Sequence, residues 1–183
     1  MNGRLKRVWN VISWTLILCV VVLAVLLGGI RLIGYKPYAV ISGSMEPTYH
    51  VGSLIYVKEV PPEKIQVGDP ITFVLNEDLV VATHRVIEID PANQYFYTKG
   101  DANNAPDGAP VHFNNLIGKP MFTIPQLGYF STWVTEPPGT YIAICAVIIL
   151  VLLFFLPELL DKAEAADKRA AAKKEAREGE DQS

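Results

Sequence analysis

Two uncharged apolar blocks constrain this chain more than any other feature of its sequence. The first covers Val8–Ile30 and the second Pro137–Pro157. A helix needs about 20 apolar residues to cross the hydrocarbon core of a bilayer, so both blocks predict transmembrane helices. The first block is longer than the core of a cleaved secretory signal, and no small-x-small cleavage site follows it, which favours a retained anchor. We therefore predict spans at residues 8–33 and 137–157.

The positions of the basic residues predict how the spans are oriented. Basic residues are absent between Lys119 and the second block, whereas six follow it, at Lys162, Lys168, Arg169, Lys173, Lys174 and Arg177. The positive-inside rule therefore assigns the charged tail, residues 158–183, to the cytoplasm. Three basic residues in segment 1–7 assign the amino terminus to the same side. Residues 34–136 are then extracytoplasmic.

Composition excludes some functions for this middle segment. The net charge of the chain is −3, and no basic patch stands out, so we expect no nucleic-acid partner. Cys19 and Cys145 both lie inside the apolar blocks, which leaves the middle segment without a disulfide or a thiol site.

The residue pattern of the middle segment is typical of a β domain. Short runs rich in Val, Ile, Tyr, Phe and Thr predict strands at Ser53–Lys58, Ile71–Leu75, Leu79–Ile89 and Tyr95–Thr98. Pro, Gly and Asn clusters separate these runs, and the turn Asn76–Asp78 is short enough to predict a hairpin. The predicted fold class is therefore mostly β: a small antiparallel domain flanked by two transmembrane helices. The uncharged stretch Pro120–Val134 is predicted to seat this domain on lipid.

Three features of the middle segment are suited to nucleophilic catalysis. The turn Ser42–Thr48 holds two serines around a glycine, and a serine nucleophile needs a constrained turn with nearby oxyanion donors. His84 lies in the longest predicted strand, and a strand positions a base more rigidly than a loop does. The loop Lys99–Gly108 offers Asp101 and Asp107 to orient an imidazole. Each feature alone is more typical of an ordinary turn or a structural histidine.

The order of these elements resembles the type I signal peptidases. A Ser-Gly-Ser-Met-x-Pro-Thr turn follows the first span, and then come Gly-Asp-Pro, His-Arg-Val-Ile and Thr-Lys-Gly-Asp-x-Asn. The resemblance covers roughly residues 37–118. It is to the branch found in archaea, the endoplasmic reticulum and some Gram-positive bacteria, in which histidine replaces the lysine of other bacterial enzymes.

The resemblance implies a role for each matching residue. Ser44 matches the nucleophile, His84 the general base and Asp107 the acidic residue of the triad. The Ser42 hydroxyl and the Ser44 backbone N–H would form the oxyanion hole. Asp101 matches the aspartate of the Gly-Asp pair, and it remains an alternative to Asp107 for orienting His84. No cofactor is implied, and no metal site is predicted because no histidine–carboxylate cluster has ligand spacing.

The implied activity is removal of signal peptides from translocated precursor proteins at the outer membrane surface. The implied partners are these precursors, the lipid bilayer and the translocation machinery. Two alternatives stay open at this point: a self-cleaving Ser-Lys protease, with Lys58, Lys64 or Lys99 as its base, and a non-catalytic, membrane-tethered β module that binds partner proteins.

Overall fold

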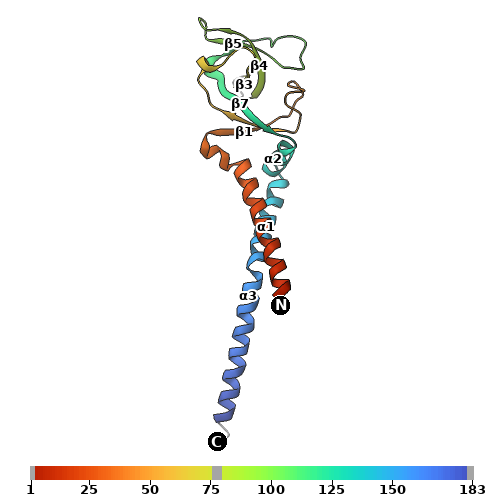
Figure 1. Ribbon diagram of the computed structural model, residues 1–183, viewed down its shortest axis with the longest axis vertical. Coiled ribbons are helices and arrows are strands. Elements are labelled where there is room, and N and C mark those ends of the chain that lie inside the picture. Colours follow the sequence, from red (N-terminus) through yellow and green to blue (C-terminus); the bar gives the residue numbers. More distant parts are fainter. Residues whose placement is uncertain (1–2, 76–79, 181–183) are drawn as a thin grey trace. The chain divides into compact units, whose positions relative to one another are not determined.

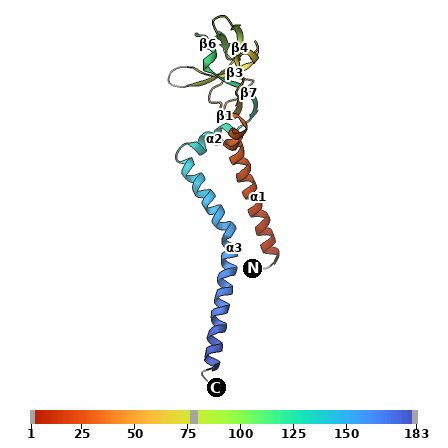
Figure 2. The ribbon, with the colours of Figure 1, turned by 90° about the vertical axis from the view of Figure 1, so that its left-hand side faces the viewer.

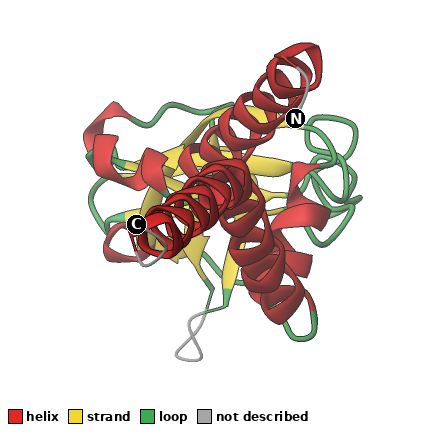
Figure 3. Ribbon diagram, turned by 90° about the horizontal axis from the view of Figure 1, so that it is seen from below, coloured by secondary structure: helices red, strands yellow, loops and turns green. Residues whose placement is uncertain are grey.

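The computed structural model describes residues 3–75 and 80–180, which form two units. Unit 1 comprises Met1–Val22 and Tyr141–Ser183, and unit 2 comprises Leu23–Thr140. Unit 1 is helical, whereas unit 2 contains the strands (yellow in Figure 3). The strands of the described residues therefore all lie in unit 2.

Most of unit 1 comes from two helices, α1 (Gly3–Leu27) and α3 (Gly139–Glu180). Within them, Arg7–Leu27 and Gly139–Leu156 are long and apolar enough to cross a membrane. These stretches are 0% and 6% buried inside the protein. They are therefore not the core helices of a globular domain, in which an apolar surface of this extent would be covered.

The strands of unit 2 form one antiparallel sheet within the described residues. They are β1 (Tyr35–Ala39), β2 (Leu54–Lys58), β3 (Pro70–Val74), β4 (Val81–Asp90), β5 (Tyr95–Lys99), β6 (Val111–His112) and β7 (Leu116–Ile124). Their order across the sheet is β1-β2-β7-β3-β4-β5-β6 (Figure 1). Strand β7, late in the chain, joins the β1–β2 pair to the remaining strands (Figure 2). The two parts of the predicted site, which precede and follow β3, thereby belong to one sheet.

Shorter helices connect the strands and complete unit 2. Among the described residues of unit 2, three are 3₁₀ helices, at Gly29–Ile33 (η1), Pro62–Lys64 (η2) and Phe113–Asn115 (η3), and one is the α-helix α2 (Leu127–Thr135). Helix α2 lies against the chain just before β2, where the Tyr129 N–H donates to the Gly52 carbonyl at 3.2 Å. Gly52 has φ +83°, and a Cβ there would lie 1.9 Å from the Tyr129 ring. Only glycine allows this close approach.

Two clusters of buried side chains stabilise the sheet. The larger cluster comes mostly from β3, β4, β5 and β6 and contains Ile65, Ile71, Phe73, Val86, Phe96 and Val111. The smaller contains Ile30, Leu54 and Tyr56, with Leu27 packed against it. The Tyr56 hydroxyl donates to the Leu26 carbonyl at 3.0 Å. The end of α1 is thus attached to the sheet by both apolar packing and a hydrogen bond.

These observations confirm the predicted fold class, an antiparallel β domain with two long apolar helices beside it in the sequence. The four strands predicted from composition match β2, β3, β4 and β5 within a few residues. Strands β1, β6 and β7 were missed. The stretch at Pro120–Val134 proves to be the second half of β7 followed by α2. The predicted turn at Asn76–Asp78 lies outside the described residues.

Truncating a core aromatic tests this assignment of the core. Phe96 is 0% exposed and stacks against Phe113, with ring centroids 4.4 Å apart. Phe96→Ala should lower the free energy of unfolding by about 3–5 kcal/mol, because the cavity adds to the lost transfer energy. The measurement is denaturant unfolding of the full chain in detergent. Tyr97→Ala, on the exposed face of the same strand, is the matched control and should change it by less than about 1 kcal/mol.

Candidate active site

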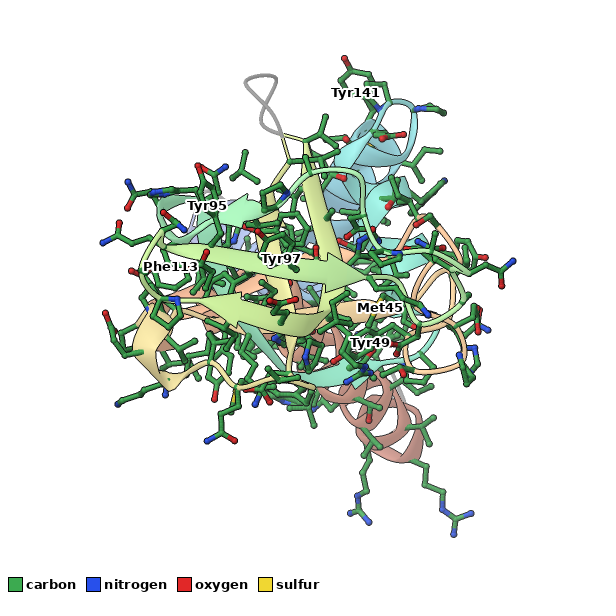
Figure 4. All side chains as sticks on the ribbon, turned by 90° about the horizontal axis from the view of Figure 1, so that it is seen from above. Met45, Tyr49, Tyr95, Tyr97, Phe113 and Tyr141 are labelled. Atoms are coloured by element: carbon green, nitrogen blue, oxygen red, sulfur yellow. The ribbon has the colours of Figure 1, made fainter. Side chains whose placement is uncertain are left out.

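The predicted nucleophile lies on a turn that is anchored at both ends. After β1 the Val40 N–H donates to the Ser53 carbonyl, and the Gly52 N–H donates to the Val40 carbonyl at 2.8 Å, which closes the loop between β1 and β2. Inside the loop, Met45 is 2% exposed. Met45, labelled in Figure 4, therefore packs beneath the turn. Ser44, beside it in the sequence, lines a cavity.

His84 faces this turn from β4. Its Nε2 lies 3.2 Å from the Ser44 Oγ. The register of β4 against β3 places His84 opposite Ile71, and the ring of Phe73 packs edge-on against the imidazole at 6.2 Å. A histidine on a paired strand with an aromatic neighbour has little freedom to rotate, which is what a proton acceptor aimed at one hydroxyl requires.

Asp107 completes a continuous chain of polar contacts. Its Oδ2 lies 2.6 Å from the His84 Nδ1, and the two side chains are only 18% and 14% exposed. An ionised carboxylate can only accept a hydrogen bond, so Nδ1 is the donor. In the neutral imidazole, Nε2 is then left unprotonated and directed at the Ser44 hydroxyl. The contact selects the tautomer that can remove a proton from serine.

Asp101, the alternative orienting residue, lies elsewhere in the network. Both of its carboxylate oxygens accept from Arg85, at 2.7 and 2.6 Å. The Thr48 hydroxyl donates to it as well, at 2.5 Å. A third guanidinium N–H of Arg85 donates to the Gly68 carbonyl. Of the two aspartates, Asp107 therefore contacts the histidine, while Asp101 and Arg85 connect the nucleophile loop to β4.

These contacts shift the protonation equilibria of the network. The hydrogen bonds from Arg85 hold the pKa of Asp101 below its ordinary value, because they stabilise the carboxylate, and the Thr48 hydroxyl acts in the same direction. The same ion pair raises the pKa of Arg85. Tyr49 lies in the same loop, four residues after Met45. Burial raises the pKa of its hydroxyl.

The backbone on either side of Ser44 is also fixed. The Ala102 N–H donates to the Ser44 carbonyl at 2.9 Å, and the Glu46 N–H donates to the Gly43 carbonyl at 3.0 Å. A Cβ at Gly100 would lie 2.6 Å from the Ser44 carbonyl oxygen. Glycine at this position is therefore required for the loop to approach the serine so closely.

Ser42 lies beside Ser44, whereas the histidines other than His84 make contacts elsewhere. The Ser42 Oγ is 3.3 Å from the Ser44 Oγ, so the two serines of the turn lie together. His50 pairs with Glu46, and the His112 Nδ1 accepts from the N–H of Asn114 at the start of η3. In the described parts of the chain, no group of three or more His, Cys, Asp or Glu side chains is placed to hold a metal ion.

A cavity of about 470 Å³ opens beside the serine and histidine. It is lined by Tyr38, Ala39, Val40, Ile41, Ser42, Ser44, Met45, Tyr49, Ile55, Val80, Val81, Ala82, Thr83 and His84. Most of these residues come from two segments, 38–45 and 80–84, and most are apolar. The cavity can hold small uncharged side chains of an extended peptide lying between the two segments.

Sequence reasoning did not single out four residues that the structure brings to this site. Arg85, Thr48, Gly100 and Thr98 were noted only as parts of motifs, and no role was given to any of them. The Thr98 Oγ1 donates to the Asp107 Oδ2 at 2.6 Å. A threonine at the start of the Thr-Lys-Gly-Asp motif was the available signal, but its partner lies nine residues away and only the loop conformation brings them together.

Comparison with known proteins finds similarity to signal peptidases. Residues 11–92 match the family described as "Signal peptidase, peptidase S26". The chain is 46% identical to Signal peptidase I W of Bacillus subtilis over 86 residues, which is 45% of each chain. It is 31% identical over 109 residues to the signal peptidase complex catalytic subunit SEC11 of Zygosaccharomyces rouxii, covering 53% of this chain and 64% of that one.

A mammalian relative extends the same pattern. The human signal peptidase complex catalytic subunit SEC11C is 27% identical over 119 residues, or 60% of this chain and 62% of its own length. The chain therefore spans between about half and two thirds of these relatives. The matches confirm the resemblance to type I signal peptidases, on the side of the family that includes the Bacillus and endoplasmic-reticulum proteins.

The Asp101–Arg85 pair gives a prediction about stability and pH. Because the folded-state pKa of Asp101 is depressed, its stabilising contribution is complete above the unfolded pKa of about 3.9 and is lost as pH falls through the folded value. Asp101→Asn should therefore lower the melting temperature at pH 7 and flatten its dependence on pH below about 4. The check is thermal unfolding of the full chain in detergent between pH 2.5 and 7. An unchanged acid dependence would contradict the assignment.

Proposed function

We propose that this chain is a membrane-bound serine endopeptidase that removes signal peptides from translocated precursor proteins. The observation that carries the proposal is the contact chain Ser44–His84–Asp107, at 3.2 and 2.6 Å, beside an apolar cavity. The similarity to signal peptidases supports the substrate class.

In the proposed reaction His84 accepts the proton of Ser44 as the hydroxyl oxygen attacks the scissile carbonyl carbon. Asp107 stabilises the resulting imidazolium through Nδ1. His84 then returns the proton to the leaving amine, and a water activated in the same way hydrolyses the acyl-enzyme. A positioned base is worth about 10²–10⁴-fold in rate.

The negative charge on the carbonyl oxygen needs donors close to Ser44. We assign this role to the Ser44 N–H and the Ser42 hydroxyl, which lies 3.3 Å from the Ser44 hydroxyl. Removal of one such donor typically costs about 10²–10³-fold in rate. The negatively charged oxygen of the tetrahedral intermediate would accept a hydrogen bond from each of these two donors.

The substrate would bind as an extended strand along the cavity, between segments 38–45 and 80–84. Small side chains at the first and third positions before the cut would occupy the apolar cavity. Residues further towards the amino terminus would lead back to the membrane, where the apolar core of the signal peptide lies.

The proposed topology places this chemistry at the outer membrane surface. Residues 8–33 and 137–157 would be the spans, residues 1–7 and 158–183 cytoplasmic, and residues 34–136 the extracytoplasmic domain of a plasma-membrane protein. Ser44 is only eleven residues beyond Ile33, a reach of at most about 35–40 Å. The nucleophile must therefore act close to the lipid, where signal peptides are cut, and the translocation machinery that delivers precursors is a further expected partner.

Cleavage of a precursor by the purified full chain in detergent tests the activity. The wild type should cut after a small-x-small sequence, and Ser44→Ala should lower the rate by at least about 10⁴-fold because the nucleophile is lost. His84→Lys should also be inactive, since the lysine amine would neither match the imidazole geometry nor contact Asp107 as the ring does.

Ser131→Ala, which removes a serine hydroxyl from α2, is the matched control and should retain full activity. Two outcomes would count against the proposal: a wild type that stays inert with membranes supplied, or cleavage that survives Ser44→Ala. Retained activity in His84→Lys would instead show that lysine can serve as the base in this framework.

The exposed aromatic side chains of α2 support the proposal that unit 2 contacts lipid. Its aromatic residues Tyr129, Phe130 and Trp133 are 56%, 37% and 45% exposed, and aromatic side chains favour the membrane interface. In the full chain with Trp9 and Trp14 replaced by Phe, the Trp133 fluorescence should be quenched in vesicles of brominated phospholipid. Vesicles without bromine are the control. Equal emission from the two would place Trp133 in water and refute the contact.

A further inference from the structure

Thr98 contacts the proposed catalytic triad Ser44–His84–Asp107 but does not belong to it. Its side chain is 2% exposed, and its Oγ1 donates to the Asp107 Oδ2 at 2.6 Å. The same oxygen accepts from the His84 Nδ1, also at 2.6 Å. One carboxylate oxygen is therefore shared by the histidine and the threonine.

The sheet register explains how Thr98 reaches this position. Thr98 on β5 pairs with Val86 on β4, so their side chains share one face of the sheet. Side chains alternate along a strand, and His84, two residues before Val86 on β4, therefore lies on that face too. The main chain adds a second contact, because the Asp107 N–H donates to the Thr98 carbonyl at 2.9 Å. Thr98 thus holds Asp107 through both its backbone and its side chain.

A second buried threonine shows what distinguishes Thr98. Thr72, on β3, is 0% exposed, and its hydroxyl pairs with the hydroxyl of Thr83 at 2.8 Å. That contact joins two neutral groups and satisfies a buried hydroxyl, which is the usual structural role. Thr98 instead donates to a carboxylate, and a hydrogen bond to an ionised acceptor is stronger and more directional.

We propose that Thr98 is a positioning residue for the proposed peptidase reaction and acts through Asp107. The carboxylate of an aspartate turns easily about its terminal torsion. The Thr98 hydroxyl fixes that rotation so that Oδ2 faces the His84 Nδ1, and the imidazole in turn keeps Nε2 directed at Ser44. This inference rests on the proposed function.

The proposal predicts a defect in turnover and not in substrate binding. The described residues that line the cavity come from segments 38–45, 49, 55 and 80–84, and β5 contributes none of them. Removing the Thr98 hydroxyl should therefore leave KM nearly unchanged. The loss in kcat should be about 10- to 100-fold, the factor expected when one hydrogen bond to a charged group is lost.

The experiment compares four forms of the full chain in detergent with one precursor substrate. Thr98→Val removes the hydroxyl at nearly constant volume, Thr98→Ser restores it without the methyl group, and Thr72→Val removes a buried hydroxyl elsewhere in the sheet. We expect kcat to fall about 10- to 100-fold in Thr98→Val, with KM within about twofold of the wild type. Thr98→Ser and Thr72→Val should stay within about threefold of wild-type kcat.

A double-mutant cycle tests whether Thr98 acts through Asp107. In an Asp107→Asn background the charged acceptor is gone, so adding Thr98→Val should change kcat by less than about twofold. Equal losses in both backgrounds would overturn the proposal, as would equal losses in Thr98→Val and Thr72→Val. If Asp107→Asn lowers the rate below detection, the contrast between Thr98→Val and Thr98→Ser decides, and equal loss in both overturns it.

The same set of variants distinguishes a folding defect from a loss of activity. Far-ultraviolet circular dichroism of each variant shows whether it is folded, and Thr98→Ala replaces Thr98→Val if the valine does not fit. If wild type cuts, Ser44→Ala does not and Thr98→Val equals wild type, the positioning role fails while the proposed function stands. If the wild type itself does not cut, it is the proposed function that fails.

Discussion

Two consecutive residues on β4, His84 and Arg85, connect the segments on which the site depends. Neighbouring residues of a strand project to opposite faces, so one strand can serve two sets of partners. His84 contacts Ser44 and Asp107, while Arg85 binds Asp101 and the Gly68 carbonyl. The loop before β2 and the loop after β5 are both attached to the same short stretch of β4. The geometry of the serine and the histidine therefore follows from the pairing of β4 within the sheet.

This arrangement assigns different tasks to the two aspartates of one loop. Asp101 makes a two-pronged ion pair with Arg85 and accepts from Thr48, so it ties the loop to the strand and to the serine turn. Asp107 contacts His84 and Thr98. The hydrogen bond to the imidazole is therefore made by Asp107, while the oxygens of Asp101 accept from Arg85 and Thr48.

Much of the fold and part of the site could be predicted from the sequence. Strands β2 to β5 carry local signals, namely β-branched and aromatic runs bounded by turn residues. Strand β1 has Pro37 at its centre, and β7 contains Gly118 and Pro120, which composition alone assigns to turns. Gly118 adopts φ +152° where a Cβ would lie 2.1 Å from the Lys58 carbonyl oxygen. That close approach exists only once β7 has inserted between β2 and β3, so no local pattern could reveal it.

The choice between Asp101 and Asp107 could not be made from spacing for the same reason, since it depends on how one loop folds over β4.

The anchored turn has a consequence for the reacting carbonyl. A peptide unit is planar and trans, so its N–H and C=O point in opposite directions. The Gly43 carbonyl is turned inward to accept from Glu46, and the N–H of the same peptide unit is that of Ser44. This amide is therefore directed away from that carbonyl, so in the proposed reaction a dipole for the developing negative charge would be in place before a substrate binds.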